Sequence, residues 1–222
     1  ESPVKKPLSP VKDFEAYYRD LVSKAANGDN EAAQELIRMN KPLAEEGHAS
    51  AQVVLGFAYK AGMGVPQNFA LSAYWFRRAA EQGEKTAQAQ LGTLYVLGQG
   101  VKKDYIEAIR WLRMAAEQGE AEAQYKLATF YIGGGGGIAQ DFILAHMWLN
   151  LSASQEYKDA YGLREELSKQ LTPAQLAEAQ RLARQWKPKT SSPDRPQDAS
   201  GSQPAASGTG FVISRQGHVL TN

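Results

Sequence analysis

Three histidines and one run of glycines are the residues that could support chemistry in this chain of 222 residues. His48, His146 and His218 lie far apart in the sequence and lack the spacing of metal ligands. Five glycines occupy residues 133–137, but the Gly-Lys-Ser/Thr sequence of a phosphate-binding loop does not follow them. We therefore predict no catalytic residue, no metal site and no cofactor.

The composition argues against several classes of partner. The formal net charge is +1, so charge alone does not favour nucleic acid or a membrane surface as a ligand. There is no cysteine, which excludes disulfides and thiolate metal sites. No apolar run approaches the roughly 18 residues that a membrane span requires, so we expect no membrane insertion.

The elements that must position side chains repeat every 36 residues. Ala44-Glu45-Glu46-Gly47 recurs almost unchanged from Ala80 and again from Ala116. Other residues at this interval are Ala51, Ala87 and Ala123; Leu55, Leu91 and Leu127; Tyr59, Tyr95 and Tyr131; and, with one extra residue in the glycine run, Trp75, Trp111 and Trp148. Such a period is the signature of a stacked repeat architecture.

Each repeat is predicted to be a pair of helices. Ala51, Leu55 and Tyr59 are spaced as one face of a helix, and Gly62 ends that helix before a second one carries Phe69 and Trp75. Because one such pair cannot bury its apolar face alone, successive copies must stack. The expected fold is an all-α solenoid of helix–turn–helix repeats.

The domain organisation follows from these repeats and from shifts in composition. We predict a disordered segment at residues 1–12, N-terminal capping helices at 13–43, repeats at 44–153, C-terminal capping helices at 154–186 and a flexible, disordered linker at 187–207. Thr172-Pro173-Ala174-Gln175 is a capping box that begins a helix. The glycine run is predicted to be a mobile connection.

The alanine, glycine, Leu-Gly and tyrosine pattern over about residues 25–153 resembles the Sel-1-like repeat, a relative of the tetratricopeptide repeat. The resemblance implies a right-handed superhelix that serves as an adaptor in multiprotein assemblies, mostly in bacteria. It implies no catalytic site. Because such proteins are often secreted or in the envelope, we expect a periplasmic or secreted protein.

One row of side chains is predicted to line the concave face and bind a protein or peptide. Helical geometry places this row opposite Leu55 and its equivalents. Its members are Val53, Phe57, Lys60, Ala89, Thr93, Val96, Tyr125, Thr129 and Ile132. An exposed apolar row is typical of a binding groove. The alternative is that the chain's own last helices, or a segment after them, cover it. Scattered Glu and Lys pairs are interpreted as a solvated face.

The last residues, 208–222, differ in character from the repeats. Two short β-prone runs flank Gly217, which predicts a hairpin. The spacing of Gly208, Gly210, Phe211 and Leu220-Thr221-Asn222 resembles the opening hairpin of trypsin-like, HtrA-like serine proteases. That resemblance implies that the chain stops just before the catalytic histidine and that His218 is not that residue. No complete triad is therefore expected here.

Two functions remain open from the sequence. The first is a scaffold that binds a protein or peptide. The second is the N-terminal targeting or regulatory region of a serine endopeptidase whose catalytic domain follows this chain. A hydrolase of the cysteine-rich subset of Sel-1-like proteins is disfavoured because the chain has no cysteine.

Overall fold

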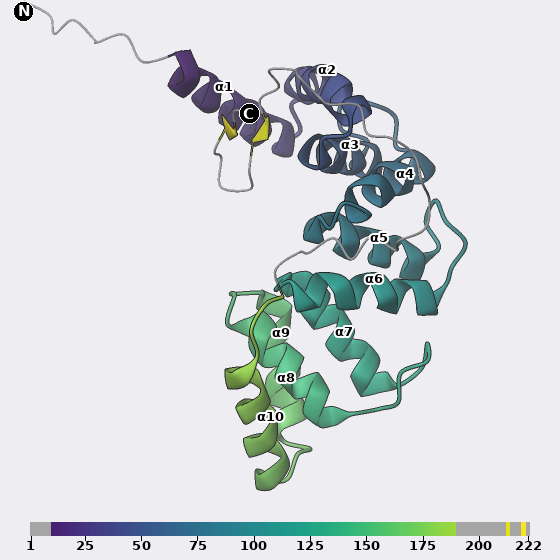
Figure 1. Cartoon of the computed structure of the whole chain (residues 1–222), viewed down its shortest axis with the longest axis vertical. Helices are drawn as coiled ribbons and strands as arrows, with labels where there is room; N and C mark the ends of the chain where they lie inside the picture. The colour runs from purple at the N-terminus through teal and green to yellow at the C-terminus, as the bar shows by residue number, and fades with distance from the viewer. Residues whose placement is uncertain (1–9, 190–211, 214–218, 221–222) are drawn as a thin grey trace, which may run out of the picture. The chain divides into compact units, whose positions relative to one another are not determined.

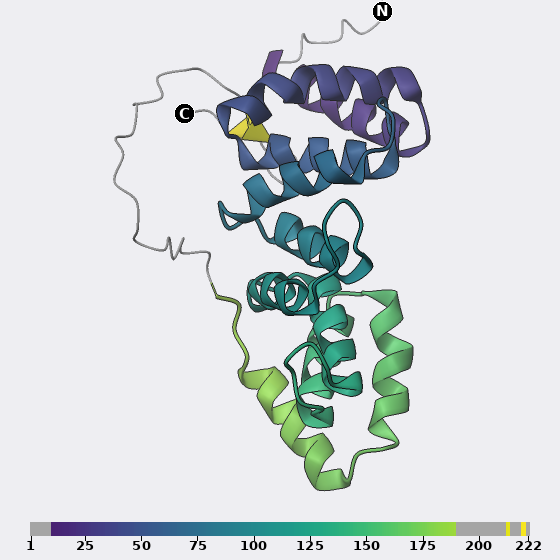
Figure 2. The same ribbon diagram turned by 90° about the vertical axis from the view of Figure 1, so that its right-hand side faces the viewer.

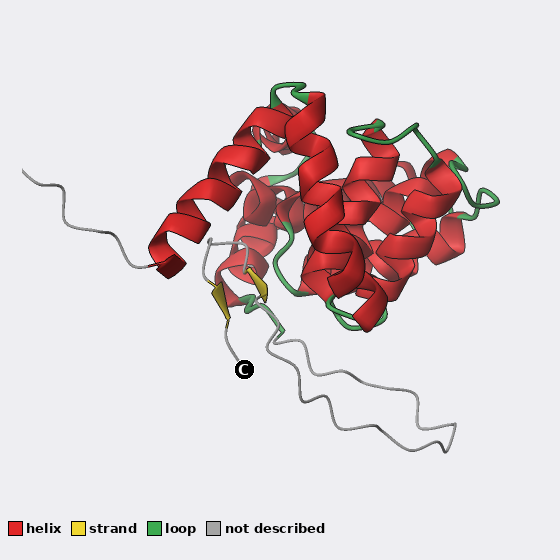
Figure 3. Ribbon diagram, turned by 90° about the horizontal axis from the view of Figure 1, so that it is seen from above, coloured by secondary structure: helices red, strands yellow, loops and turns green. Residues whose placement is uncertain are grey.

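The computed structural model describes residues 10–189, 212–213 and 219–220 (Figure 1). Helix accounts for nearly all of these residues (Figure 3). The helices in the described part are α1 (Pro10–Ala26), α2 (Asn30–Glu46), α3 (Ala49–Ala61), α4 (Phe69–Ala80), α5 (Lys85–Leu97), α6 (Tyr105–Glu117), α7 (Ala121–Gly133), α8 (Phe142–Ala153), α9 (Lys158–Ser168) and α10 (Pro173–Gln185). The predicted all-helical fold is confirmed.

Local sequence signals explain where these helices begin and end. Asp104 and Asp141 cap the first turns of α6 and α8 by accepting hydrogen bonds from backbone N–H groups. Gly62 and Gly98 end α3 and α5 in the left-handed conformation, which glycine adopts without steric cost. The capping box predicted at Thr172 is present at the start of α10. The 36-residue period therefore corresponds to helix pairs with glycine stops.

The chain divides into two compact units, and the boundary falls after Trp75 inside α4. In the described part of the first unit, α1 packs on α2 and α2 packs on α3. Leu21 and Leu36 lie in one apolar cluster, and Leu55 and Trp75 lie in another.

The first unit differs from the sequence prediction at two places. Helix α1 begins at Pro10, inside the segment predicted to be disordered. Helix α2 runs through Pro42 to Glu46, so the predicted boundary at residue 43 lies within a helix. Ala44 is fully buried, and this packing holds the last turn in place despite the backbone donor that proline lacks.

The second unit contains the end of α4 and helices α5 to α10. Consecutive helices α5, α6, α7 and α8 pack in order, and α8 contacts both α9 and α10. Figure 2 shows α9 and α10 diverging from the turn that joins them. The core gathers around Leu112, Leu127 and Leu149, which are fully buried.

The glycine run is a hydrogen-bonded turn, where the sequence predicts a mobile connection. The backbone N–H of Gly135 donates to the carbonyl oxygen of Ile138 at 2.8 Å, and the reverse bond measures 3.0 Å. Residues 134–137 all have positive φ, which four consecutive glycines permit. Ile138 is buried in the core and anchors the turn.

Two short strands follow the helical part. β1 (Val212–Ile213) and β2 (Val219–Leu220) pair antiparallel, with Val212 opposite Leu220. The connection between them lies outside the described residues, as do most of the residues on which the protease resemblance depends. None of the helices described here combines the length and the apolar character that crossing a membrane requires.

Candidate protein-binding surface

A buried glutamine on the first helix of each repeat fixes that helix against the preceding one. Each side-chain amide donates to the carbonyl oxygen of an alanine in the last turn of the preceding helix, which lacks a partner within that helix. These contacts are Gln52 to Ala44 at 3.1 Å, Gln88 to Ala80 at 3.1 Å and Gln124 to Ala116 at 3.2 Å. The three glutamines are fully buried. The face opposite them is thereby held in one orientation.

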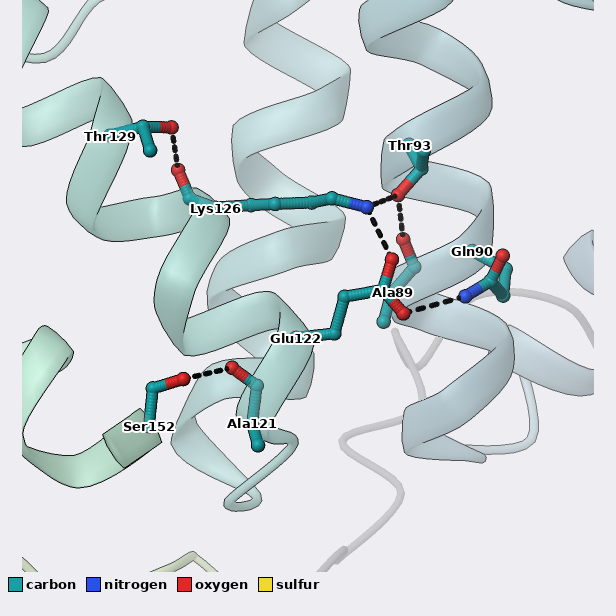
Figure 4. Close-up of polar contacts among 8 residues, drawn as sticks. All are labelled: Ala89, Gln90, Thr93, Ala121, Glu122, Lys126, Thr129 and Ser152. Atoms are coloured by element: carbon teal, nitrogen blue, oxygen red, sulfur yellow. Dashed lines mark hydrogen bonds and ion pairs between the residues drawn. The ribbon is translucent and has the colours of Figure 1, made fainter. Parts of the chain in front are cut away.

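In the second unit, a polar network connects α5 with α7 (Figure 4). The ammonium group of Lys126 donates to Thr93 Oγ1 at 2.7 Å and forms an ion pair with Glu122 one turn earlier. The other carboxylate oxygen of Glu122 accepts from Gln90 Nε2 at 2.9 Å. The side chains of Lys126 and Glu122 are only 25% and 28% exposed, so water screens this pair less than a surface pair.

Apolar side chains lie beside this network. Val96 of α5 and Tyr125 and Ile132 of α7 are half-buried and pack against the core of the second unit. Thr129 is exposed and donates through its hydroxyl to the carbonyl oxygen of Lys126 at 2.7 Å. Glu122, Lys126, Val96, Tyr125, Thr129 and Ile132 together define what we call the α5–α7 surface.

Two of the predicted surface residues contribute little open surface. Ala89 is 1% exposed and belongs to the core, and Thr93 is 9% exposed beneath Lys126. The helical wheel assigns both to the outer face, but Ala89 belongs to the core cluster that includes Leu127 of α7, and Lys126 of α7 reaches Thr93. The contact area available on α5 is therefore centred on Val96.

The predicted residues of the first repeat lie on α3 in the first unit. Val53, Phe57 and Lys60 are each half-buried. The backbone carbonyl of Lys60 accepts a hydrogen bond from Gln67 Nε2 at 2.9 Å. These three residues belong to the first unit, whereas the α5–α7 surface belongs to the second.

The start of α9 covers part of the α5–α7 surface. The Tyr125 and Tyr157 rings lie with centroids 5.3 Å apart at an interplanar angle of 41°. Burial, reinforced by the nearby carboxylate of Glu122, raises the pKa of the Tyr157 phenol. The alternative that the last helices cover the predicted row thus applies at Tyr125, through the first residues of the C-terminal helix pair.

Sequence reasoning missed the network residues Gln90, Glu122 and Lys126. The spacing of Glu122 and Lys126 matches the i, i+4 pairs that we interpreted as a solvated face. In the structure this pair instead bonds to a neighbouring helix: Glu122 accepts from Gln90, and Lys126 donates to Thr93, both on α5. Periodicity could have suggested it only indirectly, since Gln90 and Glu122 are 32 residues apart.

The histidines occupy unrelated places in the described residues. His48 precedes α3 and lies 3.7 Å from Glu46, whereas His146 is buried in α8. No group of three or more potential metal ligands occurs within the part of the chain that the structure describes. His218 lies outside it.

Stacked helix pairs, repeated glutamine contacts and a face shared by successive first helices define an α-solenoid repeat protein. Comparison with family models identifies the repeat: residues 49–84, 85–120 and 121–157 match the Sel1 repeat. The chain therefore contains three consecutive Sel1 repeats. Proteins with this repeat generally act as scaffolds for protein–protein interactions.

Solved structures of Sel1-type proteins are similar to this chain. A Sel1 repeat protein from Oxalobacter formigenes is 29% identical, with a TM-score of 0.56 over 68% of this chain and 59% of its own. A protective antigen present in uropathogenic Escherichia coli strains, which displays an SLR fold, is 28% identical, with a TM-score of 0.65 over 94% of this chain and 47% of its own. This chain thus spans only about half to three fifths of their lengths. No curated protein matches its sequence.

These comparisons concern the helical repeats. Neither the Sel1 matches nor the two solved structures extend the likeness to a trypsin-like protease. The resemblance of residues 208–222 to a protease hairpin stays a prediction from the sequence.

Proposed function

We propose that this chain is an interaction scaffold that binds a peptide or protein segment on its α5–α7 surface. The observation that carries the proposal is the arrangement of half-buried apolar side chains around a fixed ion pair. Val96, Tyr125 and Ile132 offer apolar contact area, and the Glu122–Lys126 pair offers oriented polar groups. A few polar groups within an apolar surface are typical of specific recognition sites.

The rigidity of this surface supports binding. Because Lys126 is held by Glu122 and Thr93, its position is fixed before any partner arrives. A surface that is already ordered loses less side-chain entropy on binding. Val53, Phe57 and Lys60 on α3 are proposed as a further contact area in the first unit.

A peptide-library selection against the full chain tests this proposal. We expect selected peptides to bind at least about tenfold more weakly to Tyr125→Ser. Truncation of an aromatic anchor commonly costs about 2 kcal/mol or more of binding free energy. Thr129→Arg places a bulky charge on an exposed position and should weaken binding without affecting the core. Isothermal titration calorimetry measures both effects.

Tyr161→Ser is the matched control, because Tyr161 is an exposed tyrosine on α9 outside the surface. Circular dichroism must show that each variant keeps its helical signal and thermal transition. If the selected peptides bind the Tyr125→Ser and Thr129→Arg variants as tightly as the unaltered chain, the α5–α7 surface is not the binding site.

A second proposal concerns the protein to which this sequence belongs. The glycine and Leu-Thr-Asn spacing of residues 208–222 supports an N-terminal targeting or regulatory role for a serine endopeptidase, with a periplasmic or secreted location. Reading the gene beyond Asn222 tests it. A histidine soon after, followed by an aspartate and a Gly-x-Ser-Gly motif, would support the protease, and a sequence without them would refute it.

A further inference from the structure

A cleft of about 490 Å³ opens between α9 and α10, over α8. We call it the α9–α10 cleft and define it by His146, Asn150, Arg164, Ser168, Lys169 and Gln180. It lies within the second unit and does not include the α5–α7 surface. Its lining is mainly polar, which is unusual for the space between packed helices.

The histidine of the cleft hydrogen-bonds to a serine of α9. Ser168 Oγ donates to the carbonyl oxygen of Arg164 at 2.8 Å. His146 Nε2 lies 2.9 Å from the same Ser168 oxygen. Nδ1 is buried and has no hydrogen-bond partner among the described residues.

Arg164 brings positive charge to this cleft and has no ion-pair partner among the described residues. It is half-buried, donates to Asn150 Oδ1 at 3.3 Å and lies over the Tyr161 ring at 5.5 Å. Burial first, and then the charge of Arg164, lower the pKa of His146. The Arg164 guanidinium is thus close enough to His146 to disfavour protonation of its ring.

The cleft carries an excess of positive charge. Arg164 and Lys169 are cationic, and Glu165 is the single carboxylate that lines it. Within the described residues, none of these three groups has an oppositely charged partner within the 4.0 Å of an ion pair. An arginine that is partly removed from water favours a carboxylate or phosphate, which its planar donors match.

We propose that the α9–α10 cleft binds a compact oxyanion, a carboxylate or phosphate group of a small molecule, through Arg164 and Lys169. The amides of Asn150 and Gln180 supply neutral hydrogen-bonding groups at the same place. Glu165 limits the excess charge, so the cleft favours a single anionic group over a polyanion. This site is separate from the proposed scaffold surface and does not depend on it.

The bound anion has a specific effect on the floor of the cleft. It offsets the charge of Arg164, which makes protonation of His146 less unfavourable and raises the pKa of that imidazole. The three histidines of the chain give few ring signals in a proton–carbon correlation spectrum, so His146 can be followed individually.

The experiment titrates the full chain with sodium acetate and with sodium phosphate, each against sodium chloride at constant ionic strength. We expect a saturable shift of the His146 ring signals with acetate, phosphate or both, and a higher pKa of His146 at saturation. The comparison of the two salts identifies which oxyanion the cleft takes. A response equal to that of chloride, or a pKa of His146 unchanged at saturation, overturns the proposal.

Variants test whether the cleft residues are responsible. Arg164→Gln and Lys169→Gln should each lower the affinity for the anion at least about tenfold, which corresponds to about 1.4 kcal/mol of binding free energy. Lys169 is exposed, so its variant should fold even if Arg164→Gln does not. Arg113→Gln removes the same charge from an exposed position on α6 and serves as the control. Equal responses in the control and the two cleft variants would refute the site.

Discussion

In the second unit, each buried glutamine accepts a hydrogen bond from another glutamine of the same repeat. Gln118 Nε2 donates to Gln88 Oε1 at 2.8 Å, and Gln155 Nε2 donates to Gln124 Oε1 at 2.9 Å. Each buried amide therefore receives one hydrogen bond and donates another to a helix-terminal carbonyl. A fully buried side chain with both groups satisfied stabilises one packing arrangement over others.

Gln88→Ala should destabilise the fold by about 1–3 kcal/mol. The substitution removes one of the two hydrogen bonds that the carbonyl of Ala80 accepts, and it leaves the half-buried amide of Gln118 without its acceptor Gln88. Hydrogen bonds lost at buried polar groups are costly. Gln170→Ala, at an exposed position, is the control and should change the free energy of unfolding by less than about 0.5 kcal/mol. Urea denaturation followed by circular dichroism measures both. Equal effects would contradict a structural role for Gln88.

His146 makes stability depend on pH. Its pKa in the folded chain lies below the ordinary value of 6.5, because burial and Arg164 disfavour the charged ring. The unfolded chain therefore binds the proton first as the pH falls. The stabilising contribution is complete above 6.5 and is lost as the pH falls from there through the lower pKa of the folded state.

We predict that His146→Gln loses part of this pH dependence, because glutamine cannot be protonated and can still donate to Ser168. Denaturation midpoints measured from pH 8 down to pH 5 should fall less steeply for the variant than for the unaltered chain. Parallel curves would show that His146 does not contribute to the pH dependence of folding.

At the level of elements, the connection between α7 and α8 depends on glycine for two separate reasons. Gly136 has φ of +58°, and a Cβ atom there would lie 2.5 Å from Ile109 Cδ1 and 3.0 Å from Tyr105 Cβ. Gly133, in the last position of α7, has no atom near its hypothetical Cβ. Substitution of these two glycines should therefore have opposite effects on stability.

Gly136→Ala should destabilise the second unit by about 1–3 kcal/mol, through the strained backbone and the displacement of Ile109. Gly133→Ala should be neutral or slightly stabilising, because alanine is the better helix former. Thermal unfolding of the two variants provides the comparison. A neutral Gly136→Ala would support the mobile connection that the sequence suggested.

At the scale of the whole molecule, the chain stays attached to the helical part beyond the point where composition predicts a linker. We call Trp186 to Lys189 the C-terminal strap. The Trp186 ring packs edge-on against Trp148 with centroids 6.1 Å apart. The backbone N–H of Lys189 donates to the Glu117 carbonyl at 2.8 Å, and its ammonium lies 2.9 Å from the Glu117 carboxylate. Residues 187–189 are thus held, although the sequence predicts that a linker begins at Lys187.

Limited proteolysis with mass spectrometry should yield a resistant fragment that extends through Lys189. Trp186→Ala removes the aromatic anchor of the strap, so the resistant fragment should then end nearer to Gln185. A fragment that ends at Gln185 in the unaltered chain would show that the strap opens readily in solution. Unchanged boundaries in the variant would show that the Glu117 contacts suffice.

The sequence by itself determined the helix pairs, their period, the glycine stops and the capping box at Thr172. These features depend on contacts within one helix or one turn, where spacing along the chain fixes which residues meet. It placed Val96, Tyr125 and Ile132 on the first helices of their repeats, where they are half-buried, and their role in binding stays a prediction.

Only the tertiary structure decided which residues meet across helices. Ala89 is buried in the same core cluster as Leu127 of α7, and Lys126 reaches Thr93 on another helix. The charge of Arg164 acts on the buried His146 because α9 packs on α8. These pairs are 18 or more residues apart, and their contact depends on how helices pack and not on a period. Packing therefore decided which face is open and where the cleft forms.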